Sequence, residues 1–584
     1  MQLVRRFRLP ALLCALAVLA CALISRPYAS MGVADDGPYI LMARHLARTG
    51  HIVYNGWAAP MLGWQLCLGA AFIKLFGASF TAVRMSTSMV AVLAAFVLQR
   101  TLVLAGVNER SATLGTLALV LSPLYLMLSV TYMSDIFGLF AVVTCLYGCL
   151  RALQALSDRA AIFWLCFAVA TNAIFGTARQ IAWLGILVMV PSVLWLLRGR
   201  RRVLSAGSAA TLTGALFILA CMHWLSRQPY FVPSPLFGHS ATLARAFGQL
   251  CNLLLDVPFL LLPVSALFLP ELFVAPRRSR VTVSLSAVLL AYILIAVVTR
   301  HHHPLLLLEP TSGNDGGWVG VKGVYQGMVI RGLPFFLHVG SQTLLTIASL
   351  GGLLGFFAVA LMTRATASAP GPSRVAPESV SWTQLGALFL PFTLAYALLL
   401  LSAAFGGATV NLYDRYALDL LPLFLLWSVR FYQERVRTQL PAVAMVLILL
   451  MAVYATAATH NTFAIYRARV TLAEELKAQG VPSTSVDNGW EYNLGVELRR
   501  SGHINEPRIR VPAGAYVSAS PPPAGSCSTY LGDRTPHVHP VYGISFDPNA
   551  CYGQAPFAPV HYSRWLAKSP GTLYVVRYLP PPKQ

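Results

Sequence analysis

The sequence predicts an all-α polytopic membrane protein that carries a small soluble α/β domain at its C-terminal end. Of its 584 residues, 57% are hydrophobic and only 11% are charged, which is more apolar than a soluble chain needs. Apolar runs long enough to cross a bilayer recur before position 460, and the composition then turns polar. We therefore expect a membrane domain over residues 1–459 and a soluble domain over residues 460–584.

The distribution of charge along the chain indicates how the protein is oriented in a membrane rather than a nucleic-acid partner. The formal net charge is +22, and the basic residues lie scattered in short loops instead of forming one patch or tract. Such a distribution is typical of the positive-inside rule for membrane proteins, and it argues against nucleic-acid binding.

The first apolar run, residues 9–24, follows a cluster of three arginines and is either a signal peptide or a first span. Ala29 lies near a plausible cleavage point, but Arg26 and Pro27 are poor neighbours for cleavage, so we predict an uncleaved span. Residues 37–49 then form an amphipathic pattern typical of a helix lying along the membrane surface. A second surface helix is predicted over residues 61–76, and both belong to an outer loop at 26–82.

The remaining apolar runs give, with the first, about thirteen crossings. They are predicted at 83–104, 113–130, 136–150, 161–177, 181–197, 203–225, 247–274, 281–298, 338–362, 382–405, 417–429 and 440–458.

The arginines of the loops between these runs alternate in a regular way. They fall on one side of the predicted topology, which the positive-inside rule makes the cytoplasm. The opposite side receives Asp35, Asp36, Asp135, a loop at 299–337 and the whole C-terminal domain. We therefore expect a multi-pass protein of a bacterial inner membrane with a periplasmic C-terminus.

Asp35 and Asp36 form an adjacent pair of acids just after the first span. Two carboxylates at a membrane surface are costly, so they are candidates for a functional site. The alternative is that Asp36 only caps the helix that begins at Gly37-Pro38, since Asp and Pro both suit a helix start.

Other polar residues on the same side each have a structural alternative. Asp135 begins a span and would equally serve as a helix cap. Arg179 lies in the turn between two spans, where an arginine often only extends its charge toward water. Arg415 and Tyr416 follow Asp414, and the plainer interpretation is a surface ion pair between Asp414 and Arg415.

Two features of the loop at 299–337 are weaker candidates. Consecutive histidines at 301–303 point in different directions, so we do not expect them to chelate one metal ion. The glycine-rich stretch at 309–318 is more typical of a mobile cover than of a ligand set.

In the C-terminal domain, we expect a helix around 473–477 and strands at 508–511 and 572–576. The domain contains Cys527 and Cys551, whereas the other eight cysteines lie in or beside apolar runs. A disulfide between Cys527 and Cys551 is expected if this domain faces an oxidising compartment.

The outward-facing residues make chemical sense as a set. A carboxylate can act as general base toward a hydroxyl, guanidinium groups match phosphate, and tyrosines can hold a sugar. A reaction that needs these groups at a membrane surface is sugar transfer from a lipid-phosphate carrier.

These residues carry a resemblance to integral-membrane glycosyltransferases of the C-type fold, near glycosyltransferase family 39. That group includes protein O-mannosyltransferases and lipid A aminoarabinose transferases. The resemblance covers roughly residues 1–430 and rests on the order of weak motifs. The motifs are Asp35-Asp36, Pro60…Lys74-Leu75-Phe76-Gly77…Arg84, Ser122-Pro123 with Ser134-Asp135, Gly176…Arg179, and Arg415-Tyr416…Leu421-Pro422. Two positions depart from the family pattern, which has Glu at position 36 and often Lys at position 179.

The resemblance implies an enzyme that uses a polyprenyl-phosphate sugar as donor and an envelope lipid, glycan or protein as acceptor. Asp35 would be the general base, with Asp36 next, and Asp135 would orient the acceptor or hold a divalent metal ion with Asp35. Arg179, Arg415 and Tyr416 would bind the donor phosphate.

The competing class is a transporter or a membrane protein that only binds lipid-linked sugar. A transporter predicts ionisable residues in the middle of spans and repeated halves. Here the acids gather at one face and no repeat is evident.

Overall fold

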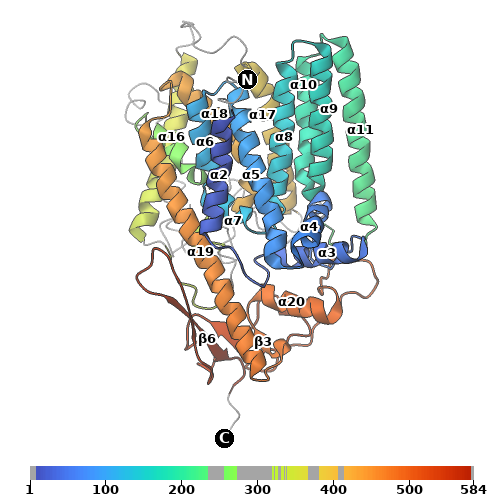
Figure 1. Cartoon of the computed structure of the whole chain (residues 1–584), viewed down its shortest axis with the longest axis vertical. Coiled ribbons are helices and arrows are strands. Elements are labelled where there is room, and N and C mark those ends of the chain that lie inside the picture. Colours follow the sequence, from blue (N-terminus) through green and yellow to red (C-terminus); the bar gives the residue numbers. More distant parts are fainter. Residues whose placement is uncertain are drawn as a thin grey trace.

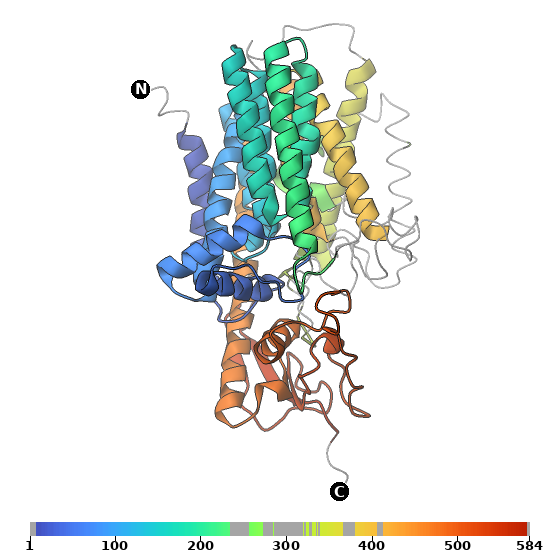
Figure 2. The same ribbon diagram turned by 90° about the vertical axis from the view of Figure 1, so that its right-hand side faces the viewer.

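The computed structural model is a bundle of long helices with a smaller domain packed against one end (Figure 1). The first helix begins at the end of the bundle that is far from the smaller domain (Figure 2). The histidines at 301–303, the stretch 309–318 and most of the run at 281–298 lie outside the described residues. The structure describes residues 8–233, 256–271, 339–365, 380–405 and 413–580, with 284, 319–320, 323–325, 330–334 and 336.

The bundle has α8 near its middle, where it packs against α5 and α9 (Figure 1). Short segments connect several of the helices: η1 (Gly176–Ala178), η2 (Gln180–Trp183), η3 (Gly185–Met189), α13 (Leu262–Ser265), η4 (Ala266–Phe268) and η6 (Asp414–Ala417). The helices are α2 (Leu9–Ile24), α5 (Phe80–Leu104), α6 (Glu109–Val120), α7 (Pro123–Ser129), α8 (Asp135–Leu153), α9 (Asp158–Phe175), α10 (Val190–Leu196), α11 (Arg201–Ser226), α16 (Val339–Ala365), α17 (Trp382–Phe405), α18 (Leu421–Arg435) and α19 (Ala442–Ala478).

This is a multi-pass membrane protein that is mostly helical, as predicted, but the predicted number of spans is not confirmed. Six described helices are long and apolar enough to cross a bilayer, and α6 with α7 make a seventh if they count as one broken span. Other predicted spans form shorter helices. α18 has 15 residues, which correspond to about 22 Å, short of a hydrocarbon core of about 30 Å.

The run predicted as one span at 113–130 is two helices, α6 and α7, whose axes differ by 68°. The break falls at Ser122-Pro123. Proline has no amide hydrogen to continue the first helix, so it suits the start of the second. The Ser122 side chain caps α7 by accepting a hydrogen bond from the amide of Tyr125 at 3.3 Å. The run predicted at 113–130 is therefore a bent pair of helices rather than one straight helix.

Two short helices, α3 (Asp36–Thr49) and α4 (Gly63–Phe76), lie across the end of the bundle that faces the C-terminal domain (Figures 1 and 2). They correspond to the two predicted surface helices. Gly50 ends α3 with a φ of 76°, a conformation that glycine adopts without steric cost. In α4, the Trp64 indole donates a hydrogen bond to the carbonyl oxygen of Phe175 at 2.8 Å, which ties α4 to the end of α9.

α19 is one continuous helix of 37 residues that begins in the bundle and ends inside the smaller domain (Figure 1). The sequence predicted two separate elements here, a span at 440–458 and a short helix around 473–477. Between them the chain has no glycine or proline, so nothing interrupts the helical hydrogen bonds. Position 460, the predicted domain boundary, lies within this helix.

The C-terminal domain is built on a four-stranded sheet in the order β3-β4-β6-β5. β3 and β4 are parallel and the other pairs are antiparallel. The strand predicted at 572–576 is confirmed in β6, but the one at 508–511 is wrong, because the amide of Arg508 is bonded to the carboxylate of Glu506 instead of to a strand. The elements are η7 (Ser483–Ser485), β3 (Val486–Asp487), α20 (Trp490–Ser501), η8 (Gly532–Arg534), β4 (Tyr542–Ser545), β5 (Val560–Tyr562) and β6 (Gly571–Arg577), next to a hairpin of β1 (Val319–Gly320) and β2 (Gly323–Val324).

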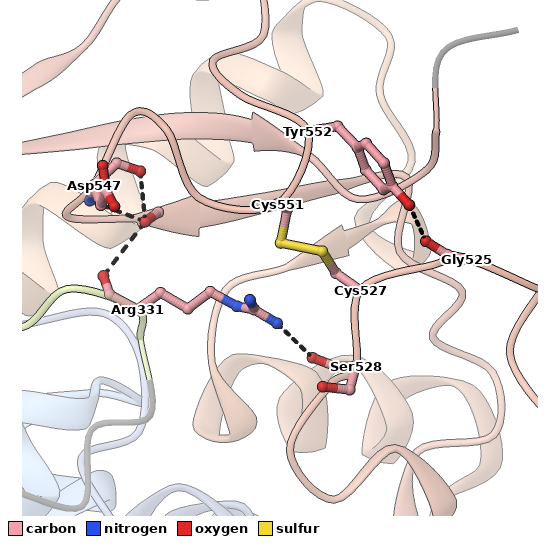
Figure 3. Close-up of a disulfide and its surroundings, with 8 residues drawn as sticks. Arg331, Gly525, Cys527, Ser528, Asp547, Cys551 and Tyr552 are labelled. Atoms are coloured by element: carbon pink, nitrogen blue, oxygen red, sulfur yellow. Dashed lines mark hydrogen bonds between the residues drawn. A yellow bond between two sulfur atoms is a disulfide. The ribbon is translucent and has the colours of Figure 1, made fainter.

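A disulfide between Cys527 and Cys551 joins two irregular segments of this domain (Figure 3). Beside it, the guanidinium of Arg331 donates a hydrogen bond to the carbonyl oxygen of Ser528 at 3.4 Å. The carbonyl oxygen of Arg331 in turn accepts one from the amide of Phe546 at 2.9 Å. Residue 331 thus ties the segment that precedes α16 to the C-terminal domain.

Candidate active site

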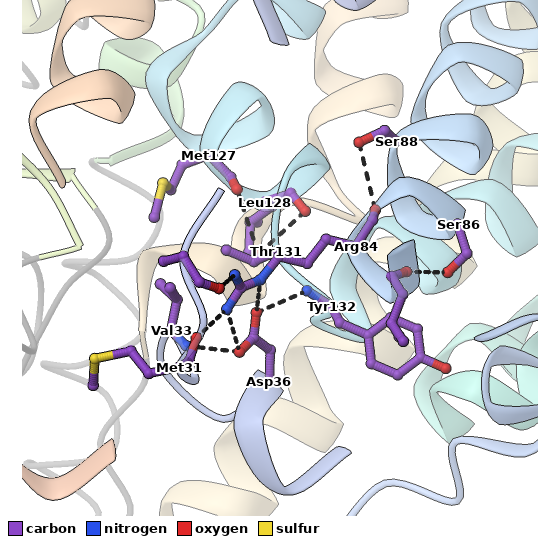
Figure 4. A network of polar contacts seen from close by, with 12 residues as sticks. Met31, Val33, Asp36, Arg84, Ser86, Ser88, Met127, Leu128, Thr131 and Tyr132 are labelled. Atoms are coloured by element: carbon purple, nitrogen blue, oxygen red, sulfur yellow. Dashed lines mark hydrogen bonds and ion pairs between the residues drawn. The ribbon is translucent and has the colours of Figure 1, made fainter. Parts of the chain in front are cut away.

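The carboxylate of Asp36 is fully buried and bonded to Arg84 (Figure 4). Its Oδ2 accepts hydrogen bonds from Arg84 Nε at 2.8 Å and from the amide of Tyr132 at 3.2 Å. Its Oδ1 accepts from Arg84 Nη2 at 3.1 Å and from the amide of Val33 at 2.6 Å. Four donors therefore occupy both oxygens of this carboxylate.

Arg84 uses its remaining donors on the segment that precedes α3 (Figure 4). Nη1 donates to the carbonyl oxygen of Ala29 at 3.0 Å, and Nη2 donates to that of Met31 at 2.7 Å. The ion pair between Asp36 and Arg84 thus fastens residues 29–36 to α5. Asp36 does not simply cap its helix, since its partners lie on other segments.

The side chain of Asp35 points to a different set of partners. Its Oδ1 accepts a hydrogen bond from the indole nitrogen of Trp57 at 3.0 Å. Its Oδ2 accepts two from Arg415, with Nη1 and Nη2 each at 3.2 Å. The side chain is 20% exposed, whereas that of Asp36 is fully buried, so Asp35 is the member of the pair that a substrate can reach.

Asp135, the first residue of α8, is bonded to Arg179, whose Nη1 donates to its Oδ1. Arg179 stands between η1 and η2 in an extended conformation, in the turn between the runs predicted at 161–177 and 181–197. A Cβ on Gly138, one turn along α8, would lie 2.8 Å from Arg179 Cδ. The guanidinium therefore reaches Asp135 because position 138 has no side chain, and Arg179 is 13% exposed rather than extended into water.

Arg415 connects the two acids. Besides its contacts with Asp35, its Nη1 lies 3.9 Å from Asp135 Oδ2. The carboxylate of Asp414 accepts hydrogen bonds from the amides of Val319 at 2.8 Å and Arg415 at 2.7 Å. Asp414 is 2% exposed, so the pair does not form the isolated surface contact that the plainer interpretation required.

The ring of Tyr416 lies beside both arginines. The guanidinium carbon of Arg179 is 5.3 Å from the ring centroid and that of Arg415 is 5.5 Å away, both within cation–π range. The hydroxyl of Tyr396 lies 2.8 Å from the carbonyl oxygen of Tyr416, which fixes this turn against α17. The aromatic ring thus holds the two cations at one place.

Sequence analysis missed Asp419 as a member of the cluster. Its Oδ2 lies 3.8 Å from Arg179 Nε and 3.2 Å from the hydroxyl of Tyr396. A signal was present, because Asp419 falls inside the apolar run predicted at 417–429, and an ionisable residue in such a run is a functional candidate.

Tyr39 is a second residue that sequence analysis passed over. It lies in the first turn of α3 and is 4% exposed. Burial, together with the nearby charge of Asp35, raises the pKa of the Tyr39 hydroxyl well above its ordinary value. The hydroxyl therefore stays protonated at neutral pH and remains a hydrogen-bond donor next to the acids.

The cluster holds more acceptors than it uses. Its described members are Asp35, Asp135 and Asp419 on the acidic side, with Arg179 and Arg415 on the basic side. Within the described part of the chain, Asp135 Oδ2 and Asp419 Oδ1 have no hydrogen-bond partner although both are buried. Buried acceptors without donors are costly, and substrate hydroxyl groups would satisfy them.

A divalent metal does not fit the arrangement of Asp35 and Asp135. Each carboxylate is bonded to an arginine, and the guanidinium of Arg415 occupies the space between them. In the described residues, no group of three or more His, Cys, Asp or Glu side chains is placed to hold a metal ion.

The C-terminal domain contributes to the site through a pair of tryptophans. Trp490 of α20 stacks on Trp57, with the ring centroids 5.4 Å apart and the planes 29° from parallel. Trp57 donates the hydrogen bond that holds Asp35 Oδ1. The soluble domain therefore supports the orientation of the exposed acid.

No known protein family matches the chain, and no curated protein does. Several solved structures are similar in fold. The structure of ArnT from Cupriavidus metallidurans in the apo state is 15% identical with a TM-score of 0.39, and 82% of each chain is covered. ArnT bound to undecaprenyl phosphate is 14% identical with a TM-score of 0.41, covering 96% of this chain and 97% of that one. The archaeal oligosaccharyltransferase AglB from Archaeoglobus fulgidus, in complex with an inhibitory peptide and a dolichol-phosphate, is 14% identical with a TM-score of 0.37, covering 80% and 59%.

ArnT and AglB are glycosyltransferases of the C-type fold, the group that the sequence resembles. At these identities and TM-scores, the likeness does not extend to activity or to individual site residues.

Proposed function

We propose that the protein is a glycosyltransferase that moves a sugar from a polyprenyl-phosphate donor to an acceptor in the cell envelope. The observation that carries this proposal is the contact of Asp35 with Arg415 at the end of the helical bundle, where Asp35 remains partly exposed. It places a base for an acceptor hydroxyl and a cation for a donor phosphate side by side.

The ion pair between Asp35 and Arg415 suggests how the donor prepares the site. In the free protein, the guanidinium of Arg415 neutralises Asp35. A phosphate matches the planar guanidinium at least as well as a carboxylate does, so an incoming donor phosphate competes for Arg415. Once the phosphate has taken the guanidinium, the carboxylate of Asp35 is released beside it and becomes available as a base.

In the transfer step, one bond to the anomeric carbon of the sugar forms while another breaks. Asp35 accepts the proton of the acceptor hydroxyl while the hydroxyl oxygen forms a bond to the anomeric carbon of the sugar. The bond from that carbon to the phosphate oxygen breaks, and its electron pair leaves on the lipid phosphate. The leaving group needs no proton, because the positive charges of Arg415 and Arg179 stabilise the phosphate.

The other members of the cluster take supporting parts in this proposal. Asp135 holds Arg179 in place and offers its Oδ2 to a hydroxyl of the acceptor. Tyr416 keeps the two guanidinium groups together. Asp36 acts as a positioning residue, because its bonds to Arg84 fix the segment that carries Asp35.

We further propose that this site lies at the periplasmic face of a bacterial inner membrane. The basis is the alternation of arginines in the sequence. Two of the loops that carry these arginines lie side by side in the structure. Arg200 Nε, in one loop, is 2.7 Å from Asp158 Oδ1, in the other. A reporter fused after the C-terminal residue should behave as an exported protein, and cytoplasmic behaviour would contradict this orientation.

The test of function is a mass-spectrometric comparison of envelope lipids, glycans and proteins in cells with the intact protein, without it, and with Asp35→Asn. We expect a sugar-modified species that is present only with the intact protein. A protein that only transports or binds lipid-linked sugar would give the same products with intact protein and with the Asp35→Asn variant.

A further inference from the structure

A cavity lies between α3 and the C-terminal domain, and none of Asp35, Asp135 and Asp419 lines it. Its volume is about 850 Å³. Its walls come from α3, from the start of α5, from the end of α19 and from α20. We name it the basic groove, after the five basic side chains that line it: Arg44, His45, Arg48, Lys477 and Arg499.

Within the part of the chain that the structure describes, the positive charges of the basic groove are largely without ion-pair partners. Among the described residues, none of its arginines or its lysine is within ion-pair distance of a carboxylate. Two acids also line the cavity, but Glu491 is paired with the buried Arg469 at 3.0 Å. Glu474 alone therefore stands against four permanent positive charges.

Arg44 shows the cost of this arrangement most clearly. It lies one helical turn before Arg48, and like charges at that spacing destabilise a helix. Burial, with the charge of Arg48 added, lowers the pKa of the Arg44 guanidinium. One of its nitrogens, Nη2, donates to the carbonyl oxygen of Ala78 at 3.1 Å, but Nε is buried without a hydrogen-bond partner among the described residues.

The basic groove lies at the end of the helical bundle that carries α3. α3 lies across the end of the bundle, and α20 follows directly beyond it (Figures 1 and 2). Apolar side chains share the lining with the cations, among them Leu41, Ile73 and Phe80. A ligand with an anionic head and an apolar body would satisfy both parts of this wall.

We propose that the basic groove binds the phosphate headgroup of an anionic phospholipid from the surrounding leaflet. Arg44 and Arg48 approach the phosphate from the membrane domain, and Arg499 approaches it from the soluble domain. Planar guanidinium groups match phosphate oxygens in pairs, and a basic surface beside a bilayer attracts anionic lipids. The lipid thus fastens the C-terminal domain to the membrane domain.

Binding is measured with purified full-length protein in neutral detergent. The probes are short-chain dihexanoyl phosphatidylglycerol, dihexanoyl phosphatidylcholine and inorganic phosphate. We expect the anionic lipid to bind and to raise the unfolding temperature, and the zwitterionic lipid to do neither. Inorganic phosphate that binds as tightly as the anionic lipid would overturn the assignment to a lipid.

Three variants locate the site. Arg44→Gln and Arg499→Gln should each weaken binding of the anionic lipid at least tenfold, since each loses a charge-assisted contact. Arg500→Gln is the matched control, because Arg500 is exposed on the same helix as Arg499 but does not line the basic groove. Equal affinities in all three variants would overturn the proposal. Arg499 is exposed, so its replacement tests binding even if Arg44→Gln folds poorly.

The proposal does not depend on catalysis. The Asp35→Asn variant should bind the anionic lipid as the unchanged protein does, and Arg499→Gln should still bind a polyprenyl phosphate. If Arg415→Gln abolishes anionic-lipid binding while Arg44→Gln and Arg499→Gln do not, the lipid binds at the catalytic cluster and the basic groove is not its site.

Discussion

Arg415 holds Asp35 through both terminal nitrogens of its guanidinium, each 3.2 Å from the same carboxylate oxygen, although 380 positions separate the two residues. The contact joins the loop after the first helix to the turn before α18. It is also only partly buried, with 20% of the Asp35 side chain and 13% of the Arg415 side chain exposed. A partly exposed contact of this kind can open for a ligand more readily than the buried ion pair of Asp36 and Arg84.

Asp35→Asn keeps the size of the side chain but removes the proton acceptor. We expect sugar transfer to fall about 10²–10⁴-fold, the usual contribution of a general base. Insertion and folding should be unchanged, because the indole of Trp57 can still donate to the amide oxygen. Transfer is measured in membranes at saturating donor. Near-normal transfer would move the base to Asp135 or Asp419.

Arg415→Lys replaces a planar fork by a point charge, so we expect binding of a polyprenyl phosphate to weaken about tenfold or more. Arg179→Lys should weaken it less, since a lysine at position 179 keeps the positive charge beside Asp135 and Asp419. Binding is measured on purified protein in detergent. An exposed control, Arg437→Lys, should change nothing, and unaltered binding in both site variants would remove the donor phosphate from these arginines.

Asp36→Asn should act on stability, because it leaves the buried charge of Arg84 without its partner. Breaking a buried ion pair in this way costs about 3–5 kcal/mol. Asp158→Asn is the matched control, since its pair with Arg200 is 40% and 26% exposed and is worth about 0–1 kcal/mol. Thermal unfolding in detergent compares the two. Equal unfolding temperatures would mean that Asp36 does not fix the segment carrying Asp35.

Gly138→Ala tests the placement of Arg179 without removing any charge. The added Cβ would lie 2.8 Å from Arg179 Cδ, so the arginine must move away from Asp135. We expect transfer to fall about tenfold or more, as a small displacement of a positioning group can do. Gly386→Ala, on α17, meets no atom within 4 Å and serves as control. Transfer that is unchanged in Gly138→Ala would show that the position of Arg179 is not critical.

The disulfide between Cys527 and Cys551 closes a loop with a sequence separation of 24, for which the chain-entropy relation gives about 3 kcal/mol. Replacing both cysteines by serine should lower the unfolding temperature of the C-terminal domain. Cys166→Ala, at an exposed free cysteine, should not. Alkylation of denatured protein should add two more groups after reduction than before, and equal numbers would mean that the bond is absent.

Hydrophobic length was enough to predict several helices closely. The runs at 83–104, 203–225 and 382–405 correspond to α5, α11 and α17, because an apolar stretch of that length has few alternatives in a bilayer. The prediction failed where a local hydrogen bond decides the structure. The cap of Ser122 starts a new helix inside the run predicted at 113–130, and the short segments η2 and η3 replace regular α-helix at the start of the run predicted at 181–197.

For the site, the sequence identified Asp35, Asp135, Arg179, Arg415 and Tyr416 as candidates, and the structure brings these five together. Which side chain bonds to which depends on contacts between helices far apart in the chain, and no spacing encodes them. The resemblance ranked Asp35 above Asp36, but the sequence did not predict that Asp35 is partly exposed while Asp36 is fully buried against Arg84. The predicted topology placed these residues on one face of the membrane. The packing of the helices determines which side chain bonds to which.

The 37 residues of α19 correspond to a rod of about 55 Å, while the hydrocarbon core of a bilayer is about 30 Å thick. Because one unbroken helix belongs to both domains, the height of the soluble domain above the lipid depends on bilayer thickness. A thicker membrane would bring the side of that domain that faces the helical bundle closer to the headgroups, and a thinner membrane would move it away from them. Hydrophobic mismatch would then act on Trp490 and, through Trp57, on the orientation of Asp35, so lipid chain length would change the surroundings of this carboxylate.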